Sequence, residues 1–124
     1  MNLSSARLYG NVLSNASVAG LTLSETSYPS NLNLPKHSHE QAYFCFVLEG
    51  GFTEVYGRRS RTCRPSTLVF HPAGEKHSDF FRAVSRCFNL QMKAEWLDPV
   101  SRETKLLTSS ADFRGGSLGQ LAAY

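Results

Sequence analysis

The sequence has no apolar run that approaches the length of a membrane-spanning helix, which needs about 20 apolar residues. Its first thirty residues contain a single basic residue, Arg7, and no sustained apolar stretch. They therefore lack the basic start and apolar core of a secretory signal. From these two absences we expect a cytoplasmic protein with no membrane partner.

Cysteine is scarce as well. The three cysteines, Cys45, Cys63 and Cys87, are widely spaced and include no C-x-x-C pair. An odd number at such spacing indicates neither a disulfide framework nor a zinc knuckle. We interpret Cys45 as a small buried side chain at a cavity wall. Cys63 stands near arginines that favour a thiolate, but an ordinary surface thiol is a simpler interpretation than a redox sensor.

Charge of either sign is not concentrated along the chain. The 13 basic and 10 acidic residues are interspersed and give a net charge of +3, whereas a nucleic-acid surface normally shows a basic cluster. One local group of arginines consists of Arg58, Arg59, Arg61 and Arg64. We interpret it as a solvated hairpin, because alternate positions place charges on both sides of a ribbon.

What the chain does contain is a succession of short strands, in a length that fits one domain. Alternating or apolar patterns predict strands at Val18–Thr26, Phe52–Tyr56, Thr67–Phe70, His77–Arg82 and Arg86–Met92. Gly50 and Gly51 supply the left-handed backbone that tight hairpins need. Strands separated by turns at short spacing predict an antiparallel all-β sandwich or barrel. Residues 1–17 add an arm or an edge strand.

The stretch from Pro35 to Gly51 carries the most informative pattern, an H-x-H pair that leads into an apolar strand. In a single β-strand, alternate side chains share one face. The face of the first histidine carries His37, His39, Gln41, Tyr43 and Cys45. Imidazole, amide and phenol groups beside a small thiol suit the wall of a cavity. We take these residues, together with His77, as the candidate ligand-binding site.

His77 ends a P-x-G-x-x-H turn that starts at Pro72. Histidines two positions apart on a strand are separated by about 7 Å at the backbone, so both rings can reach one metal ion at about 2 Å from each nitrogen. The candidate ligands of a divalent transition metal are His37, His39 and His77. His71 lies outside this motif, before the proline, and we interpret it as a turn residue.

The H-x-H and P-x-G-x-x-H motifs, in this order and with hairpins between them, resemble the two motifs of the cupin superfamily from roughly Leu34 to Phe81. The resemblance implies a small jelly-roll β-barrel. The positions that match its metal-binding histidines are His37, His39 and His77. The cupin pattern also has a glutamate four or five residues after the second histidine, where this chain has Tyr43 or Phe44. A metal-free polar cavity is therefore slightly favoured over a tightly held ion.

Longer runs resemble the N-terminal cupin domain of AraC-type transcriptional regulators. They read H-S-H-E-Q-A-Y-F-C-F-V-L-E-G-G-F-T-E-V-Y-G from His37, T-L-V-F-H-P-A-G-E-K-H-S-D-F-F from Thr67 and F-R-G-G-S-L-G-Q-L-A from Phe113. The resemblance implies an effector-sensing domain that binds a small molecule in the barrel and forms a homodimer. Residues 94–124 show no recognition helix, so DNA binding is expected only through a C-terminal helix-turn-helix domain outside this chain.

The predicted fold class is all-β, a cupin-like jelly-roll β-barrel with a short helical C-terminal segment. We assign residues 1–93 to the barrel and residues 94–124 to the helical or irregular segment. The alternative function is a metal-dependent cupin enzyme of the dioxygenase or isomerase type with a three-histidine site. The missing glutamate and the F-R-G-G tail favour a sensor that is not an enzyme.

Overall fold

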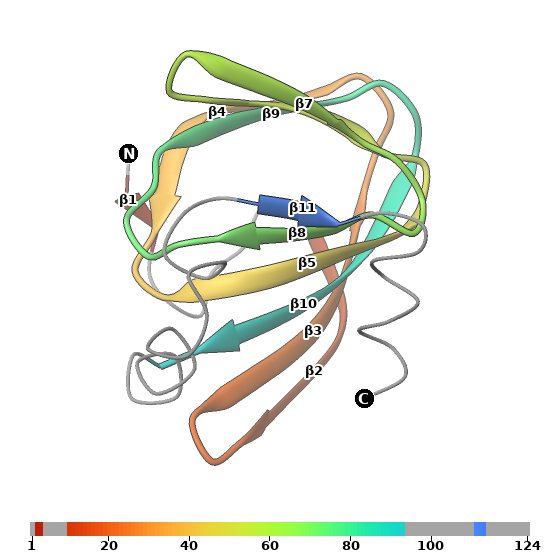
Figure 1. The fold of residues 1–124 in the computed structure, drawn as a ribbon. Helices are drawn as coiled ribbons and strands as arrows, with labels where there is room; N and C mark the ends of the chain where they lie inside the picture. Colours follow the sequence, from red (N-terminus) through yellow and green to blue (C-terminus); the bar gives the residue numbers. More distant parts are fainter. Residues whose placement is uncertain (1, 4–9, 94–110, 114–124) are drawn as a thin grey trace.

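In the computed structural model, residues 2–3, 10–93 and 111–113 are described, and their strands form two sheets that face each other (Figure 1). The five-stranded sheet consists, in spatial order, of β1 (Asn2–Leu3), β4 (Leu32–His39), β9 (His77–Phe81), β6 (Phe52–Tyr56) and β7 (Arg59–Cys63). The six-stranded sheet consists of β11 (Ala111–Phe113), β8 (Leu68–His71), β5 (Ala42–Glu49), β10 (Ser85–Met92), β3 (Leu21–Tyr28) and β2 (Asn11–Val18). The two sheets enclose the interior that holds the site.

Strand β10 shows how the sequence divides side chains between the two faces of its sheet. Burial alternates along it, so that Asn89 and Gln91 are each 1% exposed while Phe88 is 42% exposed. The inner face thus carries polar groups, which need partners inside the barrel. Asn89 Nδ2 donates a hydrogen bond to Thr26 Oγ1 at 3.0 Å, and the Thr26 hydroxyl donates to Tyr28 at 3.0 Å.

The apolar part of the interior gathers around Phe81, at the end of β9. Its ring stacks on Tyr28 with centroids 4.1 Å apart and lies 4.9 Å from the ring of Phe52. Along β9 the buried inward positions change from His77 through Asp79 to Phe81. We call the region around Phe81 the apolar end of the interior and the region around His77 the polar end.

Gly50 and Gly51 join β5 to β6 beside the apolar end. Their φ angles are +73° and +135°, values that side chains with a Cβ rarely adopt. A Cβ on Gly50 would collide with the carbonyl oxygen of Val84, and one on Gly51 with that of Cys63. The left-handed backbone predicted for this glycine pair is confirmed, but the predicted hairpin is wrong, because β5 and β6 belong to different sheets and the turn carries the chain from one sheet to the other. Close packing is a second reason for glycine here.

Two predicted strands are interrupted. The stretch from Pro35 to Gly51 is not one strand, because β4 ends at His39 and a bend at Glu40 and Gln41 carries the chain to β5 in the other sheet. The strand predicted at Val18–Thr26 is divided by the hairpin between β2 and β3. Alternation in the sequence continues across both turns, so it does not show where the chain reverses or changes sheet.

The helical segment predicted for residues 94–124 lies outside the described residues, apart from β11. Within that range Ala111–Phe113 form a strand, and Ala111 lies opposite Phe70 of β8. At the other edge of the same sheet, β2 covers residues that were expected to form an arm or edge strand. In the described part of the chain, no helix is long and apolar enough to cross a membrane.

Candidate metal and ligand site

All four histidines of the chain meet at the polar end, and each is at most 3% exposed. They are His37 and His39 of β4, His71 of β8 and His77 of β9. Neighbouring imidazole rings have centroids between 4.4 and 5.5 Å apart. The two sequence motifs therefore converge, and the six-stranded sheet contributes a histidine that neither motif includes.

A β-bulge in β4 turns its histidines inward. The register with β9 shifts between Leu34 and His37, after which His37 lies opposite His77. Leu34 and His37 are an odd number of positions apart yet both are buried, which an unbroken strand does not permit. His37 Nδ1 donates a hydrogen bond to the carbonyl oxygen of Pro35 at 2.6 Å. The proton on Nδ1 leaves Nε2 as the unprotonated ring nitrogen.

Tyr43 of β5 lies among the imidazoles. Its ring stacks on that of His71, with centroids 4.4 Å apart and an interplanar angle of 14°, and lies 4.8 Å from the ring of His39. Its hydroxyl is 3.5 Å from Nε2 of His77. Burial raises the pKa of Tyr43 well above its ordinary value, so the phenol stays protonated. A neutral donor thus stands where the cupin pattern has a carboxylate.

The carboxylate of this end comes instead from Glu54 of β6. Its two oxygens lie 2.9 and 2.8 Å from Nε2 of His71. Arg61 of β7 donates to the same carboxylate from Nε at 2.9 Å and also from Nη2. Burial alone would raise the pKa of Glu54, but the neighbouring His71 holds it well below its ordinary value. Glu54 is therefore a buried anion paired with a buried guanidinium.

Asp79 of β9 completes the polar end, opposite Glu54 in the register. Its Oδ2 lies 3.8 Å from Nε2 of His77 and 3.9 Å from Nε2 of His37. Burial, together with the charge on Glu54, raises the pKa of Asp79 well above its ordinary value. Burial and then His71 lower the pKa of His77 to about 2, and burial lowers that of His37. His37 and His77 are thus neutral at pH 7, the form that binds metals.

The space left among these side chains is small. The cavity measures about 30 Å³. Residues that line it include His37, His39, Tyr43, Cys45, Glu54, His71 and Asp79. About 10–15 Å³ of this measure holds one water molecule, and drug-sized ligands occupy pockets of about 300–1,000 Å³. The interior has room for an ion with its water or for a molecule of a few atoms.

Two sets of ligand atoms lie close enough to share a metal ion, and within each set all atoms are within 4.8 Å of one another. The first set is His37, His39 and His77, and the second is Glu54, His71 and His77. Imidazole nitrogen and carboxylate oxygen are ligands that transition metals accept. Nδ1 of His77 is buried and has no hydrogen-bond partner among the described residues. The donor atoms present therefore fit a metal ion.

The structure brings together five of the six residues predicted for ligand binding. His37, His39, Tyr43 and Cys45 line the cavity, and His77 contacts the first three. Gln41 does not join them, because it lies in the bend after β4 and lines a separate surface hollow. The binding role of the other five stays a prediction.

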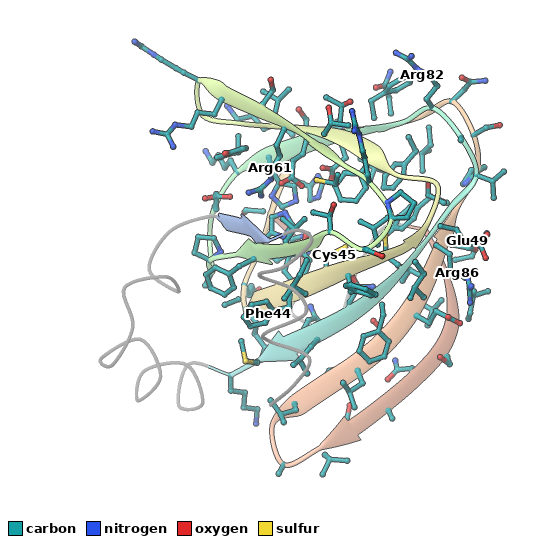
Figure 2. All side chains as sticks on the ribbon, turned by 45° about the vertical axis from the view of Figure 1, so that its right-hand side comes forward. Phe44, Cys45, Glu49, Arg61, Arg82 and Arg86 are labelled. Carbon is teal, nitrogen blue, oxygen red and sulfur yellow. The ribbon has the colours of Figure 1, made fainter. Side chains whose placement is uncertain are left out.

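Three interpretations made from the sequence are wrong. His71 is not a turn residue, because it is the last residue of β8, 2% exposed and bonded to Glu54. The β7 hairpin is not wholly solvated, because Arg61 is 8% exposed and Cys63 is fully buried. Figure 2 shows Arg61 beside the other nitrogen-bearing side chains between the sheets. Alternation along β7 turns these two side chains inward, and Cys63 is not a surface thiol.

Glu54 and Asp79 are site residues that the motifs did not indicate. Both could have been found from strand parity, since Glu54 follows the apolar Phe52 by two positions and Asp79 follows His77 by two. An acidic residue at an inward position is costly to bury without a partner. Its presence therefore indicates a paired polar group inside the barrel.

No protein-family model and no curated protein matches this chain. Solved structures do match in three dimensions. A cupin superfamily protein from Desulfitobacterium hafniense has 11% sequence identity and a TM-score of 0.59, over 69% of this chain and 82% of the other. A cupin-2 domain containing protein from Shewanella frigidimarina has 12% identity and a TM-score of 0.57, over 68% and 85%.

KdgF from Halomonas sp. is similar to the same degree, with 16% identity and a TM-score of 0.57 over 66% of this chain and 79% of that one. Identities this low show the fold and nothing about activity. The fold class predicted from the sequence is confirmed for the described residues: the chain has an all-β, cupin-like jelly-roll fold.

Proposed function

We propose that this chain is the effector-sensing domain of an AraC-type transcriptional regulator and that the effector binds at the polar end of the barrel. The proposal is supported by the three sequence runs that resemble this class of sensor. DNA binding belongs to a helix-turn-helix domain C-terminal to this chain. The barrel itself binds the small species that controls it.

The observation that carries the proposal is the enclosure of the polar end. The four histidines are at most 3% exposed around a cavity of about 30 Å³. A cavity of this volume has no room for a drug-sized substrate, which occupies about 300–1,000 Å³. A sensor instead needs to hold a small species long enough to shift an equilibrium between two arrangements. The effector is therefore a metal ion with its water or a molecule of a few heavy atoms.

Strand β8 offers a physical route from the site to the C-terminal part of the chain. His71 is its last residue and Phe70, just before it, lies opposite Ala111 of β11. An effector that changes the position of His71 changes the edge on which β11 pairs. Such a change alters DNA binding only if the effector has different affinities for the two arrangements.

The test uses the full-length regulator and its promoter DNA. Fluorescence anisotropy gives the dissociation constant of the complex with and without the effector, with divalent transition metals as the first probes. We expect at least a fivefold change, the lower range of measured allosteric couplings. A reading frame that ends soon after Tyr124 without a helix-turn-helix pair, or an effector that binds without changing DNA affinity, would overturn the proposal.

A homodimer is part of the same proposal. The outer face of the six-stranded sheet carries apolar side chains beside an ion pair of Arg86 with Glu25, with Phe88 exposed and Phe46 lying opposite it on β5. Exposed apolar faces of this kind commonly mark protein interfaces. Sedimentation equilibrium of the full chain tests this expectation.

One observation favours a second candidate, a metal-dependent cupin enzyme. The set His37, His39 and His77 offers three imidazole nitrogens, and a bound ion would act there as a Lewis acid. In this case the protein residues orient the ion and Tyr43 holds a proton 3.5 Å from His77. Turnover of a small organic substrate that requires the metal, with no effect of the metal on DNA binding, would favour the enzyme.

A further inference from the structure

The chain lacks the glutamate that the cupin pattern places on the H-x-H strand, and this raises the question of which residue supplies negative charge to an ion at the polar end. A divalent ion bound by His37, His39 and His77 would have three neutral ligands. Burying an uncompensated charge is strongly unfavourable in an interior of low dielectric. The set that contains Glu54 supplies an anionic oxygen as well as two imidazole nitrogens.

We propose that Glu54 of β6 takes the part of the missing carboxylate and that a divalent transition metal is bound by Glu54, His71 and His77. The inference rests on the proposed function only in taking the polar end as the binding site. It identifies the bound species as a metal ion. It also assigns two coordinating residues, Glu54 and His71, that lie outside the H-x-H and P-x-G motifs.

In the metal-free protein, the carboxylate of Glu54 and the ring of His71 are already close enough for one ion to bind both. Nε2 of His71 lies 2.8 and 2.9 Å from the two carboxylate oxygens, with a proton between them. When an ion binds Nε2, that proton moves to Nδ1, which is buried and has no partner in the described part of the chain. One buried hydrogen bond would thus be replaced by coordination of the ion to the same two groups.

Arg61 explains how Glu54 remains an anion without the ion. It donates to Glu54 from Nε and Nη2 and is itself 8% exposed, while its Nη1 has no hydrogen-bond partner among the described residues. The guanidinium thus serves as the counter-charge in the metal-free protein. Arg61 and the ion compete for the same carboxylate, so Arg61 lowers the metal affinity of the site.

The first experiment measures Co²⁺ binding to the full chain by isothermal titration calorimetry. Glu54→Gln and His71→Gln are expected to weaken binding by at least tenfold, the size of effect seen when metal-site residues are removed. His39→Gln is the matched control, a buried histidine of the other set, and is expected to weaken binding less. Loss of binding in His39→Gln with unchanged binding in His71→Gln would overturn the proposal.

A second measurement counts the coordinating nitrogens. Cu²⁺ bound by Glu54, His71 and His77 couples to two imidazole nitrogens in its electron paramagnetic resonance spectrum, and Cu²⁺ bound by His37, His39 and His77 couples to three. Two nitrogens are expected in the wild type. Three would assign the ion to the other set.

If Glu54→Gln does not fold, the variant Arg61→Gln provides a second test of Glu54 as a metal ligand. Without the guanidinium, the carboxylate of Glu54 depends on the ion for its counter-charge. Co²⁺ is therefore expected to raise the melting temperature of Arg61→Gln by more than that of the wild type. It should raise that of the double variant Glu54→Gln/Arg61→Gln little or not at all. Equal increases in all three proteins would contradict Glu54 as a ligand.

These outcomes are separable from those of the proposed function. Metal binding that requires Glu54 but leaves DNA affinity unchanged supports this inference and shows that the metal is not the effector of a regulator. A regulator that responds to an organic effector and shows no metal binding overturns this inference alone.

Discussion

The two ends of the barrel interior share strands β6 and β9 but are stabilised in different ways. At the apolar end, Phe81 stacks on Tyr28 and packs against Phe52, contacts that depend on filled volume and not on a particular partner. At the polar end, the buried charges depend on specific neighbours, as Glu54 depends on Arg61. One barrel interior therefore contains a packed apolar core at one end and a network of charged and polar groups at the other.

This difference predicts how each end responds to substitution. Removing side-chain volume at the apolar end leaves a cavity. The resulting loss of stability is not recovered by a second substitution at a neighbouring residue. Removing one partner at the polar end leaves a buried group unpaired, and removing its partner as well restores part of the stability. The comparison can therefore be tested with single and double variants.

The largest effect is expected for Phe81→Ala. The side chain is 3% exposed and has aromatic neighbours on both sheets. Truncation should lower the free energy of unfolding by about 3–5 kcal/mol, measured by urea denaturation. Metal affinity of the folded fraction should stay within about twofold of wild type, because Phe81 is not a ligand. A large fall in metal affinity would show that the two ends are not independent.

The next effect is expected for Glu54→Gln. The change leaves the charge of Arg61 buried without its carboxylate and should lower the free energy of unfolding by about 3 kcal/mol. Adding Arg61→Gln should recover at least 1 kcal/mol of this, on the order of the coupling found between contacting residues. A double-mutant cycle in urea gives the coupling energy. A coupling energy of zero would show that Glu54 and Arg61 contribute to stability independently of each other.

The apolar end was the easier one to predict from sequence. The period-two pattern at Phe52 marked an apolar side chain that does face inward. In β10 the alternation located the strand but not its buried face, because Asn89 and Gln91 face inward while Phe88 faces outward. The glycine pair after β5 marked a tight turn for a local reason, the left-handed backbone. What local patterns could not give was the bend at Glu40, where the chain crosses to the other sheet.

The polar end was only half predictable. His37, His39 and His77 were found because they stand in motifs with fixed spacing. Glu54 and His71 belong to no such motif, and their contact joins β6 of one sheet to β8 of the other. A pairing of this kind depends on how the two sheets pack face to face, which no spacing within one strand records.

A smaller effect distinguishes two glycines in turns, Gly50 between β5 and β6 and Gly57 in the hairpin of β6 and β7. Gly50 has φ +73°, and a Cβ there would meet Val84 and Ser85, whereas Gly57 has φ +58° and open space around the Cβ position. Gly57→Ala should lower the free energy of unfolding by about 1 kcal/mol through backbone strain alone. Gly50→Ala should lower it by about 2–3 kcal/mol, since it adds a steric clash to similar strain. Equal losses in thermal or urea unfolding would mean that the backbone around Gly50 moves to accept the methyl group.

The smallest effect on unfolding is expected for Phe88→Ala, on the outer face of the sheet whose inner face borders both ends. Phe88 is 42% exposed, so truncation should change the free energy of unfolding of the monomer by no more than about 0.5 kcal/mol. If the outer face forms the proposed dimer, the same change removes an aromatic contact from its interface. Its dissociation constant, measured by sedimentation equilibrium, should then rise about tenfold, which corresponds to about 1.4 kcal/mol. An unchanged dimer would place the interface elsewhere, and a loss of unfolding free energy as large as that of Phe81→Ala would show that burial on the inner face does not set the stability of this barrel.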